Sequence, residues 1–183
     1  MISPKFIVEK LYAHSFIKAV AITDHNTMQG YAEVRRLAAS YQDLTIIPGV
    51  EMSTHSGDCI LLGVEEEPPY TSTIWEAADF AKARGGVIVI PHPYRIGGID
   101  DLAEKIPADA IEVINPTATK RENKMAQELA KMRNLPGIAG SDAHAPLQMW
   151  TAYTEVSADL DIDEILKAIK KGWAKPVLAD AMI

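Results

Sequence analysis

Four short apolar segments of this chain are each followed directly by acidic or imidazole side chains. They are residues 19–22 with Asp24 and His25, residues 46–50 with Glu51, residues 87–90 with His92, and residues 138–141 with Asp142 and His144. In a parallel α/β barrel the strand ends and the loops after them converge on one rim, where active sites are built. The pattern therefore predicts a parallel α/β barrel whose C-terminal rim carries the chemistry.

Strand and helix signals alternate along the chain with short connections, which is typical of βα units around a parallel sheet. Strands are predicted near residues 19–23, 45–51, 59–64, 87–91, 110–114, 137–141 and 153–156. Helices are predicted near residues 4–14, 28–41 and 100–106, and from Thr73, from the Thr119–Glu122 capping box and from Asp161. In the helix after Thr119, we expect Met125, Leu129 and Met132 to face inward.

Length and composition limit the kind of protein. The 183 residues fit one domain, residues 1–183, and the net charge of −7 argues against extended nucleic-acid binding. The single cysteine, Cys59, fits a reducing cytoplasm. The longest apolar runs are too short to cross a bilayer, and the first residues lack the apolar core of a signal peptide. We therefore expect a cytoplasmic protein with no membrane partner.

Imidazole and carboxylate side chains at neighbouring strand ends suit divalent zinc, manganese or iron. A carboxylate such as Glu51 could bridge two ions, and two ions about 3.5 to 4 Å apart would activate water and hold phosphoryl oxygens. The reaction class that follows is metal-assisted phosphoester hydrolysis. Each residue alone has a plainer interpretation: Asp24 and His25 could form a turn or helix cap, and His92 could be a core histidine.

The order Thr-Asp-His-Asn-Thr (residues 23–27), Pro-Gly-Val-Glu (48–51), Pro-His-Pro-Tyr-Arg (91–95) and Gly-Ser-Asp-Ala-His (140–144) resembles the PHP (polymerase and histidinol phosphatase) family of metal-dependent phosphoesterases. The resemblance implies a distorted, TIM-like (β/α)7 barrel with up to three divalent ions at its C-terminal rim. It also implies hydrolysis of a phosphomonoester or phosphodiester, with a small phosphorylated substrate, nucleotides among them.

The resemblance implies a role for each matching residue. The metal ligands would be His25, Glu51, Asp58, His92, Asp142 and His144. Glu51, which bridges two ions, and Asp142 would be the catalytic pair. His25 and His144 would share one ion, and Asp58 would join Glu51 and His92 at another. Asp24 would orient a neighbouring group or a water. Arg95 is the candidate for binding a substrate phosphate, because a guanidinium offers forked donors, with a solvated loop arginine as the equal alternative.

The chain departs from the family pattern at its start. Family members carry a first strand ending in a His-x-His pair, ahead of the Ser-Pro that opens the first helix, and this sequence starts close to its Ser3–Pro4. We therefore expect a barrel without its first strand, an exposed barrel edge that a homo-oligomer could cover, and impaired activity. The alternatives are a catalytically inactive PHP-like binding or scaffold protein and a sequence truncated at its start.

Overall fold

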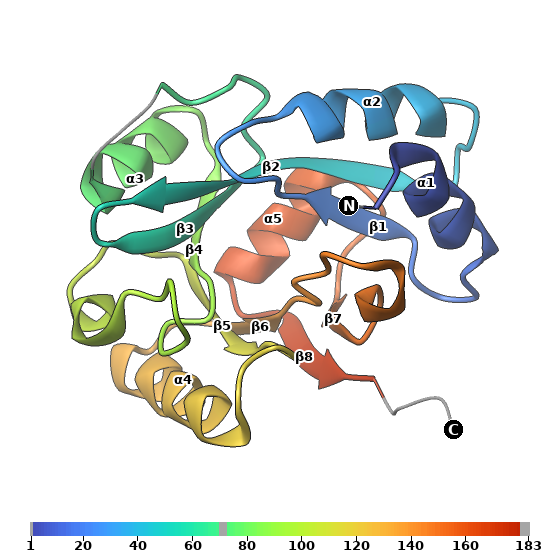
Figure 1. Cartoon of the computed structure of the whole chain (residues 1–183). Helices are drawn as coiled ribbons and strands as arrows, with labels where there is room; N and C mark the ends of the chain where they lie inside the picture. The colour runs from blue at the N-terminus through green and yellow to red at the C-terminus, as the bar shows by residue number, and fades with distance from the viewer. Residues whose placement is uncertain (1, 70–72, 180–183) are drawn as a thin grey trace.

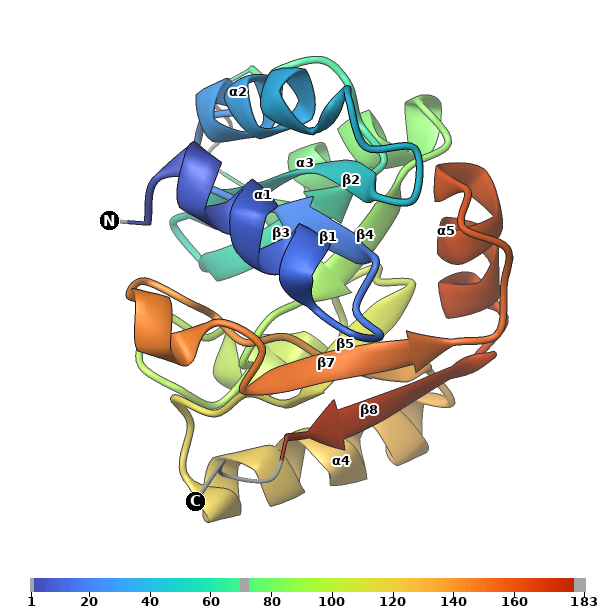
Figure 2. The ribbon, with the colours of Figure 1, turned by 90° about the vertical axis from the view of Figure 1, so that its right-hand side faces the viewer.

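The computed structural model describes residues 2–69 and 73–179, and the strands within them form two sheets (Figure 1). The six-stranded sheet has the order β1 (Ala19–Ile22), β2 (Thr45–Thr54), β3 (Gly57–Leu62), β4 (Val87–Ile90), β5 (Ala110–Ile114) and β6 (Gly137–Ala139). The two-stranded sheet pairs β7 (Ala152–Val156) with β8 (Ala174–Leu178). The strands curl around from β1 to β8, so the molecule has a mixed α/β fold built on a half-barrel (Figures 1 and 2).

The six-stranded sheet is mixed, which corrects the prediction of a wholly parallel one. β1 and β2 are parallel, as are β4, β5 and β6, but β3 is antiparallel to both β2 and β4. Only His55 and Ser56 lie between β2 and β3. A two-residue connection can join antiparallel strands, whereas parallel neighbours need a crossover of a dozen or more residues. The shortness of this loop therefore dictates the direction of β3.

The helices are α1 (Pro4–Ala13), α2 (Gln29–Ala38), α3 (Ile74–Ala83), α4 (Lys120–Arg133) and α5 (Ile162–Lys170), with short 3₁₀ segments at Asp100–Glu104 and Pro146–Gln148. Predicted helix starts are confirmed by their caps. The side chains of Ser3 and Asp161 accept backbone N–H groups, and capping boxes open α3 at Thr73 and α4 at Thr119. None of the helices in residues 2–69 and 73–179 combines the length and apolarity needed to cross a membrane.

The helices cover the curled sheet on both faces. The larger core packs one face of the strands against α1 to α4. On the other face lies α5 (Figure 2). Its residues Ile165, Leu166 and Ile169 are buried against a patch that includes Ile47 and Val87. Met132 of α4 is 62% exposed, so its predicted inward position is wrong. The buried face of α4 runs through Ala126, Leu129 and Ala130 instead.

This topology brings the candidate ligands to one edge of the sheet. The loops that hold His25, His92 and Asp142 follow β1, β4 and β6, which all run in the direction of β2. Because β3 runs the opposite way, its first residues, among them Asp58, lie at this same edge. The candidate ligands therefore lie at one rim of the half-barrel, where the parallel strands end and the antiparallel β3 begins.

Candidate metal centre

Glu51 is a buried carboxylate that faces two histidines from different loops. It lies inside β2 rather than at its end and is 6% exposed. Its Oε1 lies 3.2 Å from Nε2 of His92, and its Oε2 lies 3.6 Å from Nε2 of His25. A buried carboxylate requires a partner, because burial removes its hydration. Glu51 thus spans two imidazoles, one with each oxygen.

The loop after β1 is hydrogen-bonded along β2, and this fixes His25 beside Glu51. The backbone N–H of Asn26 donates to the Glu51 carbonyl at 2.8 Å, and the Asn26 side-chain oxygen accepts from the backbone N–H of Ser53 at 2.9 Å. Asn26 has φ +55°, a left-handed conformation that asparagine adopts more readily than most residues. The His25 side chain remains about half exposed, so its ring faces both Glu51 and solvent.

His92 is buried between two prolines directly after β4. Its backbone has φ +24°, and its N–H donates to Oε2 of Glu112 at 2.9 Å. Burial lowers the pKa of the imidazole, but the hydrogen bond to Glu51 and the nearby Glu112 charge outweigh it, so the pKa lies above its ordinary value. Within the described residues, Nδ1 of this ring is buried without a hydrogen-bond partner.

Glu112 and Asn115 are buried polar residues of the centre that the sequence interpretation missed. Glu112 accepts the His92 backbone N–H and the Nδ2 group of Asn115, the latter at 2.9 Å. Burial raises the pKa of Glu112 to about 7, although both hydrogen bonds oppose the shift. The available signal was a charged residue inside the otherwise apolar strand β5, since such a residue must find partners.

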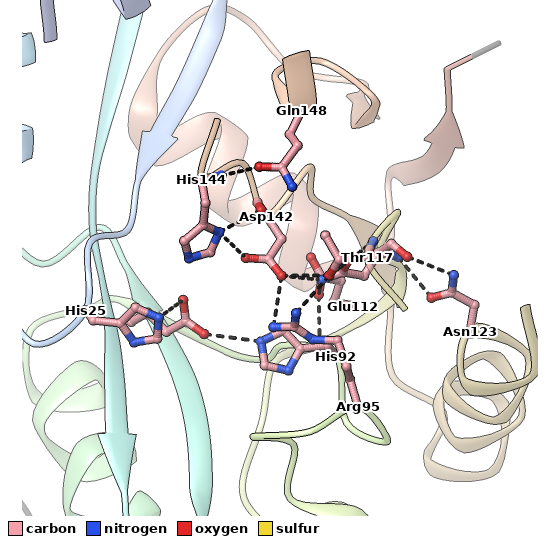
Figure 3. A network of polar contacts seen from close by, with 11 residues as sticks. His25, His92, Arg95, Glu112, Thr117, Asn123, Asp142, His144 and Gln148 are labelled. Atoms are coloured by element: carbon pink, nitrogen blue, oxygen red, sulfur yellow. Dashed lines mark hydrogen bonds and ion pairs between the residues drawn. The ribbon is translucent and has the colours of Figure 1, made fainter. Parts of the chain in front are cut away.

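Asp142 is held from three sides through one of its oxygens (Figure 3). Its Oδ2 accepts from Arg95 Nη2 at 3.0 Å and from Asn115 Nδ2 at 3.2 Å, and it lies 3.1 Å from Thr117 Oγ1. Its Oδ1 lies 3.5 Å from Nδ1 of His144. Oδ2 is therefore engaged by two donors, and Oδ1 is the oxygen through which Asp142 could bind a cation.

The His144 and His25 rings lie near each other, on the loops after β6 and β1 (Figure 3). Their ring centroids are 6.3 Å apart, and the His144 side chain is 65% exposed. The side-chain oxygen of Gln148 accepts the backbone N–H groups of His144 and Ala145 at 2.8 and 2.7 Å, which fixes this turn of the chain. The two imidazoles thus border the centre where it meets solvent.

Asp58 lies with His25 and Glu51. Each of the three side chains offers a ligand atom, and these atoms lie within 4.8 Å of one another. The backbone N–H of Asp58 donates to the Gly97 carbonyl at 3.0 Å, which ties the start of β3 to the loop after His92. The family resemblance grouped Asp58 with His92; the structure gathers it with His25.

The Asp24 carboxylate lies against α2, and the Arg95 guanidinium is already bonded to other side chains. The Asp24 carboxylate lies so close to Gly30 of α2 that a Cβ on that glycine would come within 1.8 Å of its Oδ2. It is the Asp24 carbonyl that accepts the Glu51 N–H, at 3.2 Å. The Arg95 guanidinium contacts Asp142 and Thr117, the latter at 2.9 Å, so a phosphate would have to share it with these groups.

The donor set fits a divalent cation. It combines buried and half-buried imidazoles with carboxylates from several strands, the mixture that zinc, manganese and iron bind. The buried His92 nitrogen without a hydrogen-bond partner among the described residues is a second sign, because such atoms are rare in proteins and occur at functional sites. The centre can therefore hold a metal ion at Glu51 and the histidines around it.

Comparison with other sequences points to the same family. The family profile described as PHP-associated matches residues 120–173. The uncharacterized protein MJ0417 of Methanocaldococcus jannaschii is 30% identical over 175 residues, which cover 89% of this chain and 67% of the relative. The uncharacterized protein MJ1587 of the same organism is 33% identical over 101 residues, 54% of this chain and 58% of the relative. The chain thus matches little more than half of the length of that relative.

Solved structures share the fold. PsfC of Pseudomonas syringae has a TM-score of 0.66 at 19% identity, covering 96% of this chain and 82% of that one. A Bifidobacterium adolescentis protein assigned as a metal-dependent phosphoesterase has a TM-score of 0.62 at 14% identity. An amidohydrolase of Chromobacterium violaceum has a TM-score of 0.62 at 18% identity, and each of the last two matches covers 79% of this chain and 83% of the other. Together with the ordered motifs around Glu51, His92 and Asp142, these matches show that the chain belongs to the PHP family.

Proposed function

We propose that this protein is a metal-dependent phosphoesterase that hydrolyses a small phosphorylated molecule. The observation that carries the proposal is the position of Glu51, whose two carboxylate oxygens each face a different histidine. A carboxylate placed in this way suits a bridge between two cations, the arrangement on which two-metal hydrolysis depends.

The ligands divide by position. His25, Glu51 and Asp58 would hold one ion, and Glu51 with His92 would hold a second. Asp142, through Oδ1, and His144 would complete the centre, which would then accommodate one to three ions of zinc, manganese or iron. A bound divalent ion supplies Lewis acidity, which lowers the pKa of a water molecule and offsets the charge that develops on the phosphoryl oxygens.

The protein's own residues would then position the substrate. Arg95 lies beside Asp142 and carries the forked donors that match phosphate oxygens. Burial of Glu51 and His92 keeps the inner side of the centre dry, whereas the exposed His25 and His144 rings leave its outer side open to a small solute. The net charge of −7 favours a small substrate, a nucleotide included, over an extended duplex.

The finer fold proposal is that the half-barrel is the (β/α)7 PHP barrel without its first strand. Supporting this, β1 pairs only with β2 among the described residues, so the side where a His-x-His strand would lie is unpaired. The alternative of an inactive scaffold is not favoured, because Glu51, His92 and Asp142 remain gathered around one buried centre.

The test joins metal analysis to a phosphoesterase assay. The protein is purified without chelator, its zinc, manganese and iron content is measured, and turnover of p-nitrophenyl phosphate and bis-p-nitrophenyl phosphate is followed with each metal. We expect specific binding of at least one ion per chain. Saturation at 100 times the Kd should raise the free energy of unfolding by about 2.7 kcal/mol.

Glu51→Gln keeps the shape of the side chain but removes its charge, and it should lower kcat/KM by at least about a hundredfold, more than loss of an outer partner of a ligand usually costs. Glu33→Gln is the matched control, because Glu33 pairs with Arg36 on the exposed face of α2. Metal-free protein with no thermal stabilisation by added zinc, manganese or iron, or unchanged turnover in Glu51→Gln, would refute the proposal.

A further inference from the structure

We propose that Glu112 and Asn115 are positioning residues that fix the separation of His92 and Asp142. The two candidate ligands follow different strands, β4 and β6, and β5 lies between those strands. Glu112 lies in β5, and Asn115 is the first residue after the end of β5. Both are buried, with exposures of 6% and 0%. Glu112 accepts from the backbone N–H of His92, and Asn115 donates to Oδ2 of Asp142.

The first contact acts on the backbone of His92. Oε2 of Glu112 accepts the His92 N–H at 2.9 Å. His92 has φ +24°, a sparsely populated conformation that persists only where the surrounding structure holds it. The carboxylate of Glu112 is one such constraint, and it determines where the imidazole leaves the main chain.

The second contact joins Glu112 to Asp142. Nδ2 of Asn115 donates to Oε2 of Glu112 at 2.9 Å and to Oδ2 of Asp142 at 3.2 Å. Asp142 also has a left-handed backbone, with φ +47°. One amide group thus holds the two carboxylates together, and the chain of contacts runs from the His92 main chain to the Asp142 side chain (Figure 3).

Asn115 cannot turn its amide the other way. Its Oδ1 accepts from the backbone N–H of Thr117 at 2.8 Å and from the Thr117 hydroxyl at 2.7 Å. Asn123 of α4 accepts the Asn115 N–H at 3.0 Å and donates to the Asn115 carbonyl at 2.9 Å. Because the amide oxygen faces two donors, the amide nitrogen must face the carboxylates. These contacts fix the orientation of the Asn115 amide.

The backbone leaves room for this arrangement at Gly140. A Cβ on that residue would come within 2.6 Å of the other oxygen of Glu112, Oε1. A side chain at position 140 would displace the Glu112 carboxylate. The glycine therefore lets the loop that leads to Asp142 pass close to Glu112.

The expected effect on metal affinity rests on the proposed function, whereas the positioning of His92 and Asp142 does not. Groups that orient metal ligands typically change metal affinity by about 10- to 100-fold when they are lost. The experiment therefore has a metal-free arm and a metal arm. The metal-free arm measures amide hydrogen exchange at His92 and the backbone chemical shifts of Asp142 by NMR in the presence of chelator. The metal arm measures Mn²⁺ affinity by calorimetry.

Four variants separate positioning from general stability. Glu112→Ala should speed His92 amide exchange at least about tenfold and weaken Mn²⁺ binding by about 10- to 100-fold. Asn115→Ala should shift the Asp142 resonances and weaken Mn²⁺ binding to a similar extent. Glu112→Gln retains an acceptor for both donors and should keep both properties within about threefold. Val113→Ala is the control, because Val113 is equally buried in the same strand but outside the network.

Two results would overturn the inference: unchanged His92 exchange in Glu112→Ala, or an equal loss of Mn²⁺ affinity in Val113→Ala. If Glu112→Ala does not fold, Asn115→Ala decides, and unshifted Asp142 resonances in that variant count against the inference. If the unmodified protein binds no metal, the proposed function fails, while the metal-free arm still decides whether Glu112 and Asn115 position His92 and Asp142.

Discussion

The burial of Glu112 predicts that the metal-free protein loses stability as the pH rises through neutrality. Its carboxyl group is 6% exposed, and burial raises its pKa from the ordinary value of 4.5 to about 7. A raised pKa in the folded state means that the folded protein binds a proton that the unfolded chain has already released. The contribution of Glu112 to stability is therefore fully present below pH 4.5, where this group is protonated in both states, and it is lost as the pH rises through about 7.

The size of the effect follows from the two pKa values. A difference of one unit corresponds to 1.36 kcal/mol, so a rise from 4.5 to about 7 amounts to about 3 kcal/mol. No discount for solvent screening applies, because the carboxyl group is buried. This is a large fraction of the 5 to 15 kcal/mol that stabilises an ordinary domain.

The assay is urea unfolding of the chelated protein and of Glu112→Gln at pH 5 and at pH 8. Glutamine is neutral at both values and keeps the acceptor for His92, so the difference between the two proteins isolates the ionisation of Glu112. We expect that difference to change by about 2 to 3 kcal/mol between the two pH values, because the unfolded chain has already released part of this proton at pH 5, with the unmodified protein losing stability relative to Glu112→Gln.

Glu33→Gln is the control that should show no change between pH 5 and pH 8, because Glu33 ionises only below this range. The hydrogen bond from Arg36 lowers the pKa of Glu33, so its contribution to stability is present above its ordinary pKa and is lost on acidification. A difference between the unmodified protein and Glu112→Gln that stays constant within about 0.5 kcal/mol from pH 5 to pH 8 would show that ionising Glu112 costs nothing. The linkage argument would then be refuted.

Four other substitutions test capping, packing and substrate binding. Thr119→Ala removes the N-cap of α4 and should cost about 1 kcal/mol in urea unfolding; no loss would show that the capping box is dispensable. Leu61→Ala, at a position with 0% exposure, should cost about 2 to 5 kcal/mol, whereas Leu147→Ala, at 94% exposure, should stay within about 0.5 kcal/mol, and equal costs would contradict the assigned core. Arg95→Lys should raise KM for p-nitrophenyl phosphate more than it lowers kcat, because a lysine lacks the forked donors; an unchanged KM would remove Arg95 from substrate binding.

The elements that the sequence predicts well are those with a local signal. The apolar runs of β1, β2, β4 and β5 and the capping residues of the helices appear where expected, because hydrophobic periodicity and cap chemistry act over a few residues. β8 was not predicted. Its sequence Ala-Lys-Pro-Val-Leu contains a proline, which argues against a strand, and in the structure it pairs only with β7 among the described residues.

The residues of the candidate site also fall into two groups, those with a local sequence signal and those without one. Residues that follow a recognisable strand, such as His25, His92 and Asp142, could be singled out from the sequence, because the strand end predicts their place on the rim. Glu112 and Asn115 could not be connected to them, since their contacts depend on β5 lying between β4 and β6. Strand order is a property of the whole sheet, and no short segment encodes it.

The direction of β3 explains how Asp58 reaches the centre. A rule that looks for ligands after strand ends would pass over it, because Asp58 is near the start of its strand. In an antiparallel hairpin, however, the start of the second strand lies beside the end of the first, and Asp58 pairs with Ser53, two residues beyond Glu51. The two-residue turn fixes this register, and a slip of one residue would turn Asp58 to the opposite face of the sheet. The hairpin loop is therefore as much a determinant of the candidate metal centre as the ligands themselves.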